Sequence, residues 1–220
     1  MKQVVVKLVV VGLRPFLTKA MRTTLRDTLP ADQLTPPIRA AWQHYDALAR
    51  ELPAEPTLGA SIMTRLAAMT TAVYQSLRQA GLPEAAAREK TAQVTWAVYQ
   101  KVAMPPWWLT RLLARDRLAR VRRAMGWFMR FPYAAPGYQM QFVPAGKDTV
   151  AFDVHRCPAA DYFKKQGLPE LCVSAFCNLD YPLADKWGVT LERPQTLAGG
   201  AAFCDFRFRQ LPRKEKQADE

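Results

Sequence analysis

Two cysteines near the C-terminal end of the sequence each have an aspartate close by. Cys177 lies three residues before Asp180, and Cys204 directly precedes Asp205. Residues three apart on a helix share a face, so a helical Cys177 and Asp180 would point the same way. A thiol beside an acid or base is typical of a cysteine nucleophile, whereas two thiols and a carboxylate can also bind a metal. Three alternatives follow: buried core thiols, a metal site, or a nucleophile with its helpers.

Alternation of side chains between the two faces of a strand places Cys204. In the predicted strand at 201–210, Cys204 shares one face with Phe206 and Phe208. Two phenylalanines on that face indicate that it is the buried one. We therefore expect Cys204 to point into the core, toward the helix that carries Cys177.

A second predicted strand, at 149–156, leads into a row of reactive residue types. By the same alternation Asp153, His155 and Cys157 share a face. A base beside a thiol produces the thiolate that attacks, so His155 is a candidate catalytic base. The alternative is an ordinary strand face exposed to solvent.

The spacing of Cys172 and Cys177 argues against a shared ligand set on one helix. Each helical residue turns about 100°, so residues five apart point roughly 140° away from each other. We therefore predict that Cys172 is a core thiol. The sequence has no C-x-x-C motif or zinc-finger spacing. We predict no cofactor, with a divalent metal held by Cys177, Asp180 and Cys204 as the alternative.

The net charge of +12 is concentrated in the first part of the chain. Residues 1–150 contain 21 Lys or Arg and 9 Asp or Glu, whereas residues 151–220 contain 10 of each. Four cysteines in 220 residues are too few for a disulfide-stapled secreted protein. Lys7 and Arg14 interrupt the apolar N-terminal run, which argues against a signal peptide or a membrane span. We expect a cytoplasmic protein, with peripheral contact to the inner face of the membrane as an extension.

Hydrophobic periodicity predicts an α+β fold whose N-terminal helical part packs with a small C-terminal antiparallel sheet that carries two helices. We divide the chain into a basic helical part at 1–136, a cysteine-bearing α+β part at 137–210 and a charged tail at 211–220. Helices are predicted at 3–29, 37–52, 58–80, 81–104, 105–133, 158–167 and 168–188, the last one broken near Pro182. Strands are predicted at 137–143, 149–156, 189–195 and 201–210.

The segment from Trp107 to Arg130 combines seven arginines with tryptophans and a single aspartate. One interpretation is a helix that lies on an anionic membrane surface, with its aromatic residues at the interface. The alternatives are a packed helix whose arginines face water, or a phosphate-binding stripe. Nucleic-acid binding is disfavoured because no recognisable module accompanies the charge. The predicted membrane contacts are Trp107, Trp108, Arg111, Arg115, Arg122 and Trp127.

A combination of short motifs over residues 152–208 resembles a known family. The motifs are V-x-R-C-P at the end of a strand, G-L-P-E-L leading to F-C-x-x-D, then R-x-x-T-L-A-x-G and C-D-F-R-F. Together they resemble the L-2-amino-thiazoline-4-carboxylic acid hydrolase family. The resemblance implies an enzyme that opens a cyclic C–N or C–S bond of a small substrate and yields a carbamoyl-cysteine.

The resemblance also implies which residues carry the activity. Cys177 is the expected nucleophile, with Asp180 as acid and Cys204 in support. The expected substrate-binding residues are Asp205, Arg193 and Arg207, the arginines holding a carboxylate. His155 does not come from the resemblance and depends on the alternation argument alone. The alternative function is a non-catalytic, membrane-associated thiol or metal-binding protein.

Overall fold

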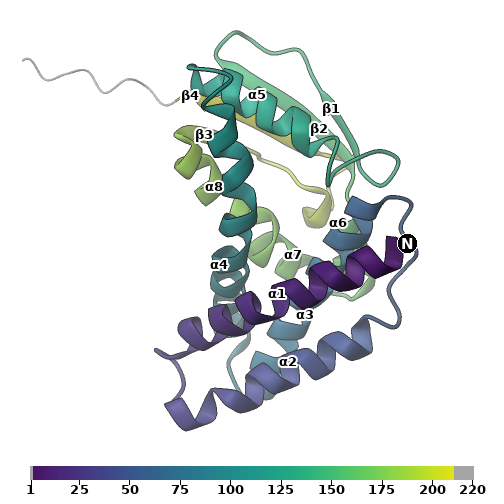
Figure 1. Ribbon diagram of the computed structural model, residues 1–220, viewed down its shortest axis with the longest axis vertical. Helices are drawn as coiled ribbons and strands as arrows, with labels where there is room; N and C mark the ends of the chain where they lie inside the picture. The colour runs from purple at the N-terminus through teal and green to yellow at the C-terminus, as the bar shows by residue number, and fades with distance from the viewer. Residues whose placement is uncertain (1, 211–220) are drawn as a thin grey trace, which may run out of the picture.

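Five helices precede the first strand in the computed structural model, which describes residues 2–210 (Figure 1). The long helix α4 passes behind α1, and α5 lies across one face of the sheet (Figure 1). The bounds are α1 (Lys2–Leu25), α2 (Thr35–Leu48), α3 (Leu58–Gln79), α4 (Glu84–Thr110) and α5 (Arg117–Phe128), with a 3-10 turn η1 (Ala31–Gln33) before α2.

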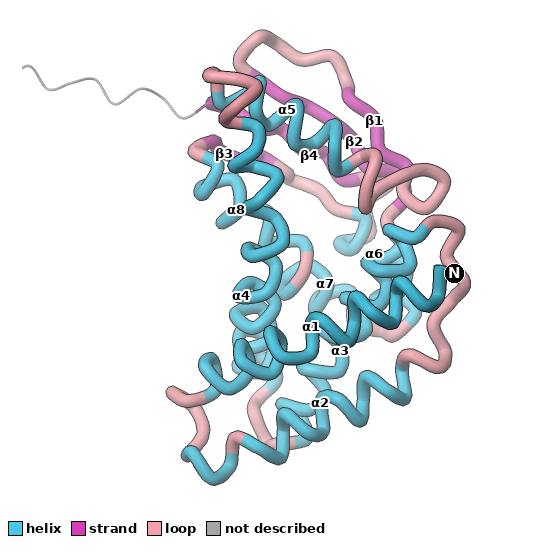
Figure 2. Tube along the Cα trace, in the orientation of Figure 1, coloured by secondary structure: helices cyan, strands magenta, loops and turns pink. Residues whose placement is uncertain are grey.

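The C-terminal part forms a four-stranded sheet in the order β1-β2-β4-β3, with antiparallel pairing throughout (Figure 2). This confirms the predicted α+β fold, although three short helices lie between β2 and β3. The predicted tail at 211–220 lies outside the described residues. The bounds are β1 (Gln139–Phe142), β2 (Thr149–Arg156), α6 (Pro158–Lys165), α7 (Pro169–Ala175), η2 (Cys177–Leu179), α8 (Asp180–Trp187), β3 (Val189–Glu192), η3 (Leu197–Gly199) and β4 (Cys204–Gln210).

The predicted helix boundary at residues 104–105 is wrong. Helix α4 continues through Pro105 and Pro106 to Thr110, and α5 starts after a break, with the Asp116 side chain accepting a hydrogen bond from its first turn. Each proline removes a backbone donor. Trp107 offsets this loss because it is buried and stacks on the ring of Trp187, with 5.1 Å between centroids. The segment 107–130 is therefore two helical pieces at an angle.

Two large hydrophobic clusters hold the molecule together, and each draws on residues from both sides of position 136. The first cluster joins α1–α4 with α6 and α7. The second cluster joins three helical pieces with the sheet: the C-terminal end of α4, helix α5 and helix α8. Residue 136 therefore marks a change in secondary structure and not a break in packing. Cys157 contacts both clusters and a third, smaller one around Tyr138.

None of the helices within residues 2–210 combines the length and the apolar character that crossing a membrane requires.

Candidate active site

The helix that carries Cys172 ends before it reaches Cys177. Helix α7 stops at Ala175, Phe176 leaves the helical conformation with φ −136° and ψ −64°, and the 3-10 turn η2 begins at Cys177. The predicted break near Pro182 is wrong, because Pro182 lies in the first turn of α8, where backbone donors have no partner in the helix.

This early break brings together two thiols that a regular helix would separate. The Sγ atoms of Cys172 and Cys177 lie 3.7 Å apart, so the expectation that they diverge is wrong. Cys172 is buried, as predicted, and Cys177 is half-buried. The hydrogen bond between the two sulfurs lowers the pKa of Cys177, and the charge of Arg193 lowers it further. The same interaction raises the pKa of Cys172. Cys177 is the member of the pair that becomes a thiolate.

Arg193 connects the carboxyl group of Asp180 to the backbone of Cys177. The Nη1 atom of Arg193 donates to Asp180 Oδ2 at 2.8 Å and to the carbonyl oxygen of Cys177 at 3.1 Å. Its Nη2 atom donates to the Asn178 side chain at 3.3 Å. Tyr99, which sequence analysis did not identify, donates its hydroxyl to Asp180 Oδ1 at 3.3 Å. One buried guanidinium thus binds both the carboxyl group of Asp180 and the backbone of Cys177.

The environment of Asp180 favours its protonated form. Burial raises the pKa of Asp180 to about 6, from an ordinary value near 3.8, although Arg193 and the Tyr99 hydroxyl oppose the rise. A carboxyl group with this pKa can hold a proton in a slightly acidic medium and donate it in a reaction. After it has donated the proton, Asp180 is a carboxylate, and the charge of Arg193 stabilises it.

Two further thiols, those of Cys204 and Cys157, line the same site as Cys177 and Asp180, and burial keeps both of them protonated. Cys204 is buried on β4, as alternation predicts, and its sulfur accepts a hydrogen bond from the Leu197 amide at 3.2 Å. Burial raises the pKa of Cys204 to about 11 and that of Cys157 to about 12. Cys157 begins the turn from β2 into α6, so the chain leaves strand geometry there and the alternation argument placed it on the wrong face.

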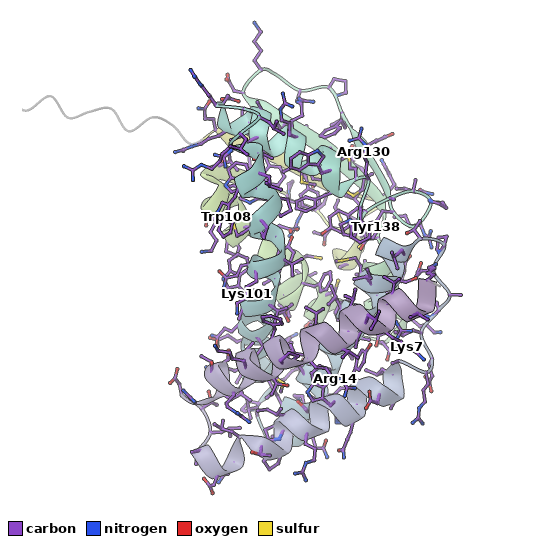
Figure 3. All side chains as sticks on the ribbon, viewed as in Figure 1. Lys7, Arg14, Lys101, Trp108, Arg130 and Tyr138 are labelled. Atoms are coloured by element: carbon purple, nitrogen blue, oxygen red, sulfur yellow. The ribbon has the colours of Figure 1, made fainter. Side chains whose placement is uncertain are left out.

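The reactive residues line one interior cavity of about 310 Å³, which we call the central cavity. It lies between α1, α3 and α4 on one side and the sheet on the other, and Tyr138, marked in Figure 3, is part of its wall. Tyr99, Tyr133 and Tyr138 are polar wall residues that the sequence pattern did not reveal. The titratable wall residues besides these tyrosines are Cys157, Cys177, Asp180, Arg193 and Cys204.

Three predicted site residues lie outside this wall. His155 is exposed on β2, with its ring 5.4 Å from that of Phe203. Arg207 donates to Asp153 at 2.8 Å across the β2–β4 pair, and Asp205 accepts a hydrogen bond from the Gln195 amide at 3.2 Å. The structure therefore brings Cys177, Asp180, Cys204 and Arg193 together and leaves His155, Asp205 and Arg207 apart from them.

Within residues 2–210, no three or more His, Cys, Asp or Glu side chains form a group that could hold a metal ion. This also applies to Cys177, Asp180 and Cys204 as a ligand set. Arg193, fixed against Asp180, would place a positive charge beside any cation there.

The predicted membrane contacts are divided between the interior and the surface. Trp107 is buried beneath the Arg120 guanidinium, which lies 3.7 Å from the centroid of its ring, so the expectation that Trp107 faces a membrane is wrong. Trp108 is 58% exposed, and Trp127 is half-buried. Arg111, Arg115 and Arg122 are exposed. Contact between this surface and anionic lipid stays a prediction.

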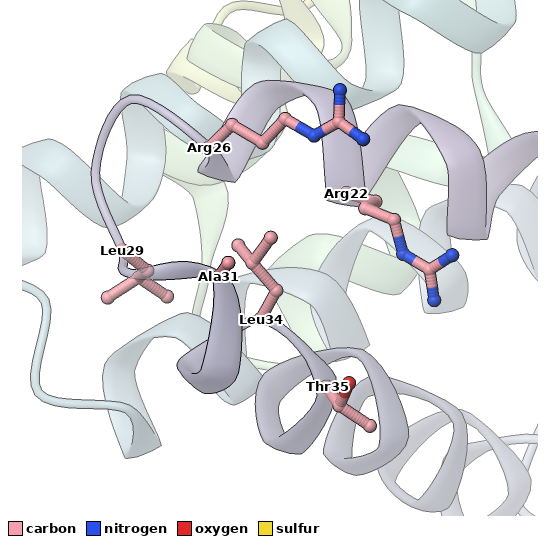
Figure 4. Close-up of a pocket in the computed structure, with 6 residues that line it drawn as sticks. All are labelled: Arg22, Arg26, Leu29, Ala31, Leu34 and Thr35. Atoms are coloured by element: carbon pink, nitrogen blue, oxygen red, sulfur yellow. The ribbon is translucent and has the colours of Figure 1, made fainter.

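A second hollow of about 390 Å³ lies where α1 turns into α2 (Figure 4). Arg22 and Arg26 border it from α1, and Leu29, Ala31, Leu34 and Thr35 complete its lining. These six residues include no thiol or carboxylate. This hollow lacks the groups for the chemistry that the central cavity supports.

Comparison with known proteins adds one finding. Residues 45–208 match the family model described as L-2-amino-thiazoline-4-carboxylic acid hydrolase. A comparison with curated proteins gave no match.

Proposed function

Because the chain belongs to the L-2-amino-thiazoline-4-carboxylic acid hydrolase family, we propose that it opens the ring of an aminothiazoline-type cyclic amidine with Cys177 as nucleophile. The observation that carries the proposal is the convergence of Cys172, Cys177, Asp180 and Arg193. This group joins a thiol of lowered pKa to a carboxyl group of raised pKa. Covalent catalysis by a thiol needs both an attacking thiolate and a proton donor.

The first half of the reaction attaches the substrate to Cys177. Asp180 transfers its proton to the ring nitrogen, which makes the C2 carbon more electrophilic, and the Cys177 thiolate adds to C2. The adduct then collapses as the bond between C2 and the ring sulfur breaks. This leaves an isothiouronium cation on Cys177 and a free thiolate on the substrate. Arg193 stabilises the carboxylate that forms on Asp180.

The second half releases the product by hydrolysis. Water adds to C2 while the carboxylate of Asp180 takes one of its protons. The bond between C2 and the Cys177 sulfur breaks, and the remaining hydroxyl proton passes to the thiolate of the substrate. The product is a carbamoylated aminothiol, and both Cys177 and Asp180 return to their starting protonation states.

Turnover of L-2-amino-thiazoline-4-carboxylate, followed by mass spectrometry, tests this proposal. We expect ring-opened product from the wild-type protein and a loss of at least about a thousandfold in Cys177→Ala, because the nucleophile is gone. Cys204→Ala is the matched control, since it removes a thiol from the same cavity wall that burial keeps protonated. Equal turnover by Cys177→Ala and the wild type would reject Cys177 as the nucleophile.

A further inference from the structure

Most of the wall of the central cavity is hydrocarbon. Asp180 and Arg193 are the charged residues among those that line it, and they lie together at the end that holds Cys177. From there the wall continues to α1, α3 and α4, which contribute mainly aliphatic side chains. Its aliphatic residues include Val9, Leu13, Leu17, Ile62, Leu66 and Val102. A small, doubly charged amino-acid substrate would leave this part of the wall without a partner.

The pairing of the two charges limits what the cavity can accept. The Nη1 atom of Arg193 lies 2.8 Å from Oδ2 of Asp180, so each of these charges already has its partner. The Arg193 side chain is 1% exposed. A free charge on the far end of a substrate would therefore be buried without an opposite charge, which is unfavourable. An apolar group in the same place would instead be removed from water against aliphatic side chains, which is favourable.

We propose that the substrate of this site carries a hydrocarbon arm, attached through the carboxyl carbon of its aminothiazoline-type ring, and that this arm lies between α1, α3 and α4. The inference rests on the proposed function, because the reactive ring at Cys177 fixes which end of the substrate faces the sheet. The substrate class is then an amide or ester of the ring carboxylate with an alkyl or aryl group.

The structure provides a route by which such an arm can enter. Val102 lines the cavity and is also 60% exposed, and Val9 is a half-buried wall residue on the neighbouring helix. The wall of the cavity therefore comes to the surface of the molecule between α1 and α4. Lys101, labelled in Figure 3, directly precedes Val102 on α4, and its ammonium lies 5.4 Å from the centroid of the Phe16 ring on α1.

Binding of two amides of 2-amino-thiazoline-4-carboxylic acid, the N-methyl and the N-hexyl amide, tests the inference by isothermal titration calorimetry. The titrations use the full chain with Cys177→Ala, which removes the proposed nucleophile so that neither amide is consumed. Each buried methylene tightens binding by about fourfold, which corresponds to about 0.8 kcal/mol. Partial burial of the chain then predicts that the hexyl amide binds at least about tenfold more tightly than the methyl amide. Equal affinities would overturn the proposal.

A matched pair of variants on α1 tests where the arm lies. Val9→Trp fills the cavity wall and should abolish the preference for the hexyl amide. Val11→Trp places the same ring on the solvent side, where Val11 is 61% exposed, and should leave the preference intact. Val102→Trp at the exposed opening is a second blocking variant that does not depend on core packing. Preservation of the preference in both blocking variants would overturn the proposal.

Turnover of the same compounds separates this inference from the proposed reaction. Suppose that the ring of the free carboxylate is opened and that the hexyl amide binds no better than the methyl amide. The proposed hydrocarbon arm is then rejected, and the proposed reaction is supported. Suppose instead that the rings of both amides and of the carboxylate stay closed, but that the hexyl amide binds more tightly and that Val9→Trp abolishes this preference. The proposed reaction is then rejected, and the apolar binding site is supported.

Discussion

At the scale of single residues, Cys172 is the nearest sulfur neighbour of the proposed nucleophile Cys177. The hydrogen bond between the two sulfurs, 3.7 Å apart, lowers the pKa of Cys177 and so favours its thiolate. We expect Cys172→Ala to raise the pKa of Cys177 and to slow alkylation of Cys177 by iodoacetamide at pH 7 by roughly tenfold, because a hydrogen bond to a charged group contributes about 1.5 kcal/mol. The measurement is the alkylation rate of Cys177 as a function of pH, read by peptide mass spectrometry in the presence of a phosphine reductant.

Cys204→Ser is the control for this experiment. It keeps a hydrogen-bond acceptor for the Leu197 amide and leaves Cys172 in place. The midpoint of the Cys177 alkylation curve should therefore stay where it is in the wild type. An unchanged midpoint in Cys172→Ala would show that the Cys172 thiol does not assist the thiolate.

Asp180 gives the proposed reaction a pH dependence with a defined direction. The acid form donates the proton, and burial raises its pKa to about 6. kcat/KM should therefore fall as the pH rises through about 6, because the donor is lost. Asp180→Asn should remove this inflection and lower kcat/KM at pH 6 by about 10² to 10⁴, the range for loss of a general acid. A profile that keeps the same inflection in Asp180→Asn would assign it to another group.

The same group also affects stability, with the opposite sign from an ordinary surface aspartate. Because the folded pKa is raised, the folded state binds more protons than the unfolded state between about pH 4 and 6. The stabilisation from Asp180 is complete below this window and is lost as the pH rises through it. Urea unfolding at several pH values should show this decrease in the wild type but not in Asp180→Asn.

At the scale of the elements, Gly59 fixes how α3 meets the chain around Pro132. A β-carbon on Gly59 would lie 1.9 Å from the backbone oxygen of Pro132, and backbone cannot move aside cheaply. The adjoining segment carries Tyr133 and Tyr138 into the cavity wall. We expect Gly59→Ala to lower the free energy of unfolding by about 2 to 4 kcal/mol, although alanine is the better helix former. Urea denaturation followed by circular dichroism measures this.

Gly12→Ala provides the comparison within another helix. A β-carbon on Gly12 of α1 meets nothing within 4 Å. The substitution then changes only the helix propensity, which is higher for alanine than for glycine. We therefore expect Gly12→Ala to raise the free energy of unfolding by up to about 1 kcal/mol. If both alanine variants changed stability in the same direction and by the same amount, the close approach at Gly59 would not be a constraint.

Local patterns predicted most of the elements, because each depends on its own periodicity and end signals. Alternation identified β2 and β4 and placed Cys204 inside. The two errors in the helices have a common cause, because distant packing decides the outcome there. Burial of Trp107 carries α4 past two prolines, and the turn at Phe176 has no proline or glycine to announce it.

The candidate site shows the same division. Cys177, Asp180 and Arg193 could be named from short motifs, whereas the 3.7 Å contact with Cys172 depends on the break at Phe176. Tyr99 lies 81 positions from its partner Asp180, so no local pattern could connect the two. His155 was predicted as a base because strand alternation placed it on the same face as Cys157. The alternation holds within β2, but the strand ends at Arg156, so Cys157 does not share that face.

At the scale of the whole molecule, the site lies where the helical part and the sheet meet. Both large hydrophobic clusters contain residues from either side of position 136. Within the second cluster, Trp107 of α4 stacks on Trp187 of α8 at 5.1 Å, and Trp187 in turn stacks on Phe128 of α5 at 6.3 Å. A shared core predicts that both parts unfold together. Circular dichroism, which reports secondary structure, and tryptophan fluorescence, which reports the packing around the six tryptophans, should give coincident transitions in urea.

Trp107→Ala tests this coupling against an adjacent control. Removing a buried tryptophan should lower the free energy of unfolding by about 3 to 5 kcal/mol and shift both transitions equally. Trp108→Ala removes the same side chain one position later, where it is 58% exposed, and should change stability by less than about 1 kcal/mol. If the two transitions separated in Trp107→Ala, the molecule would not unfold as one unit, and the central cavity would be open to rearrangement between two independent units.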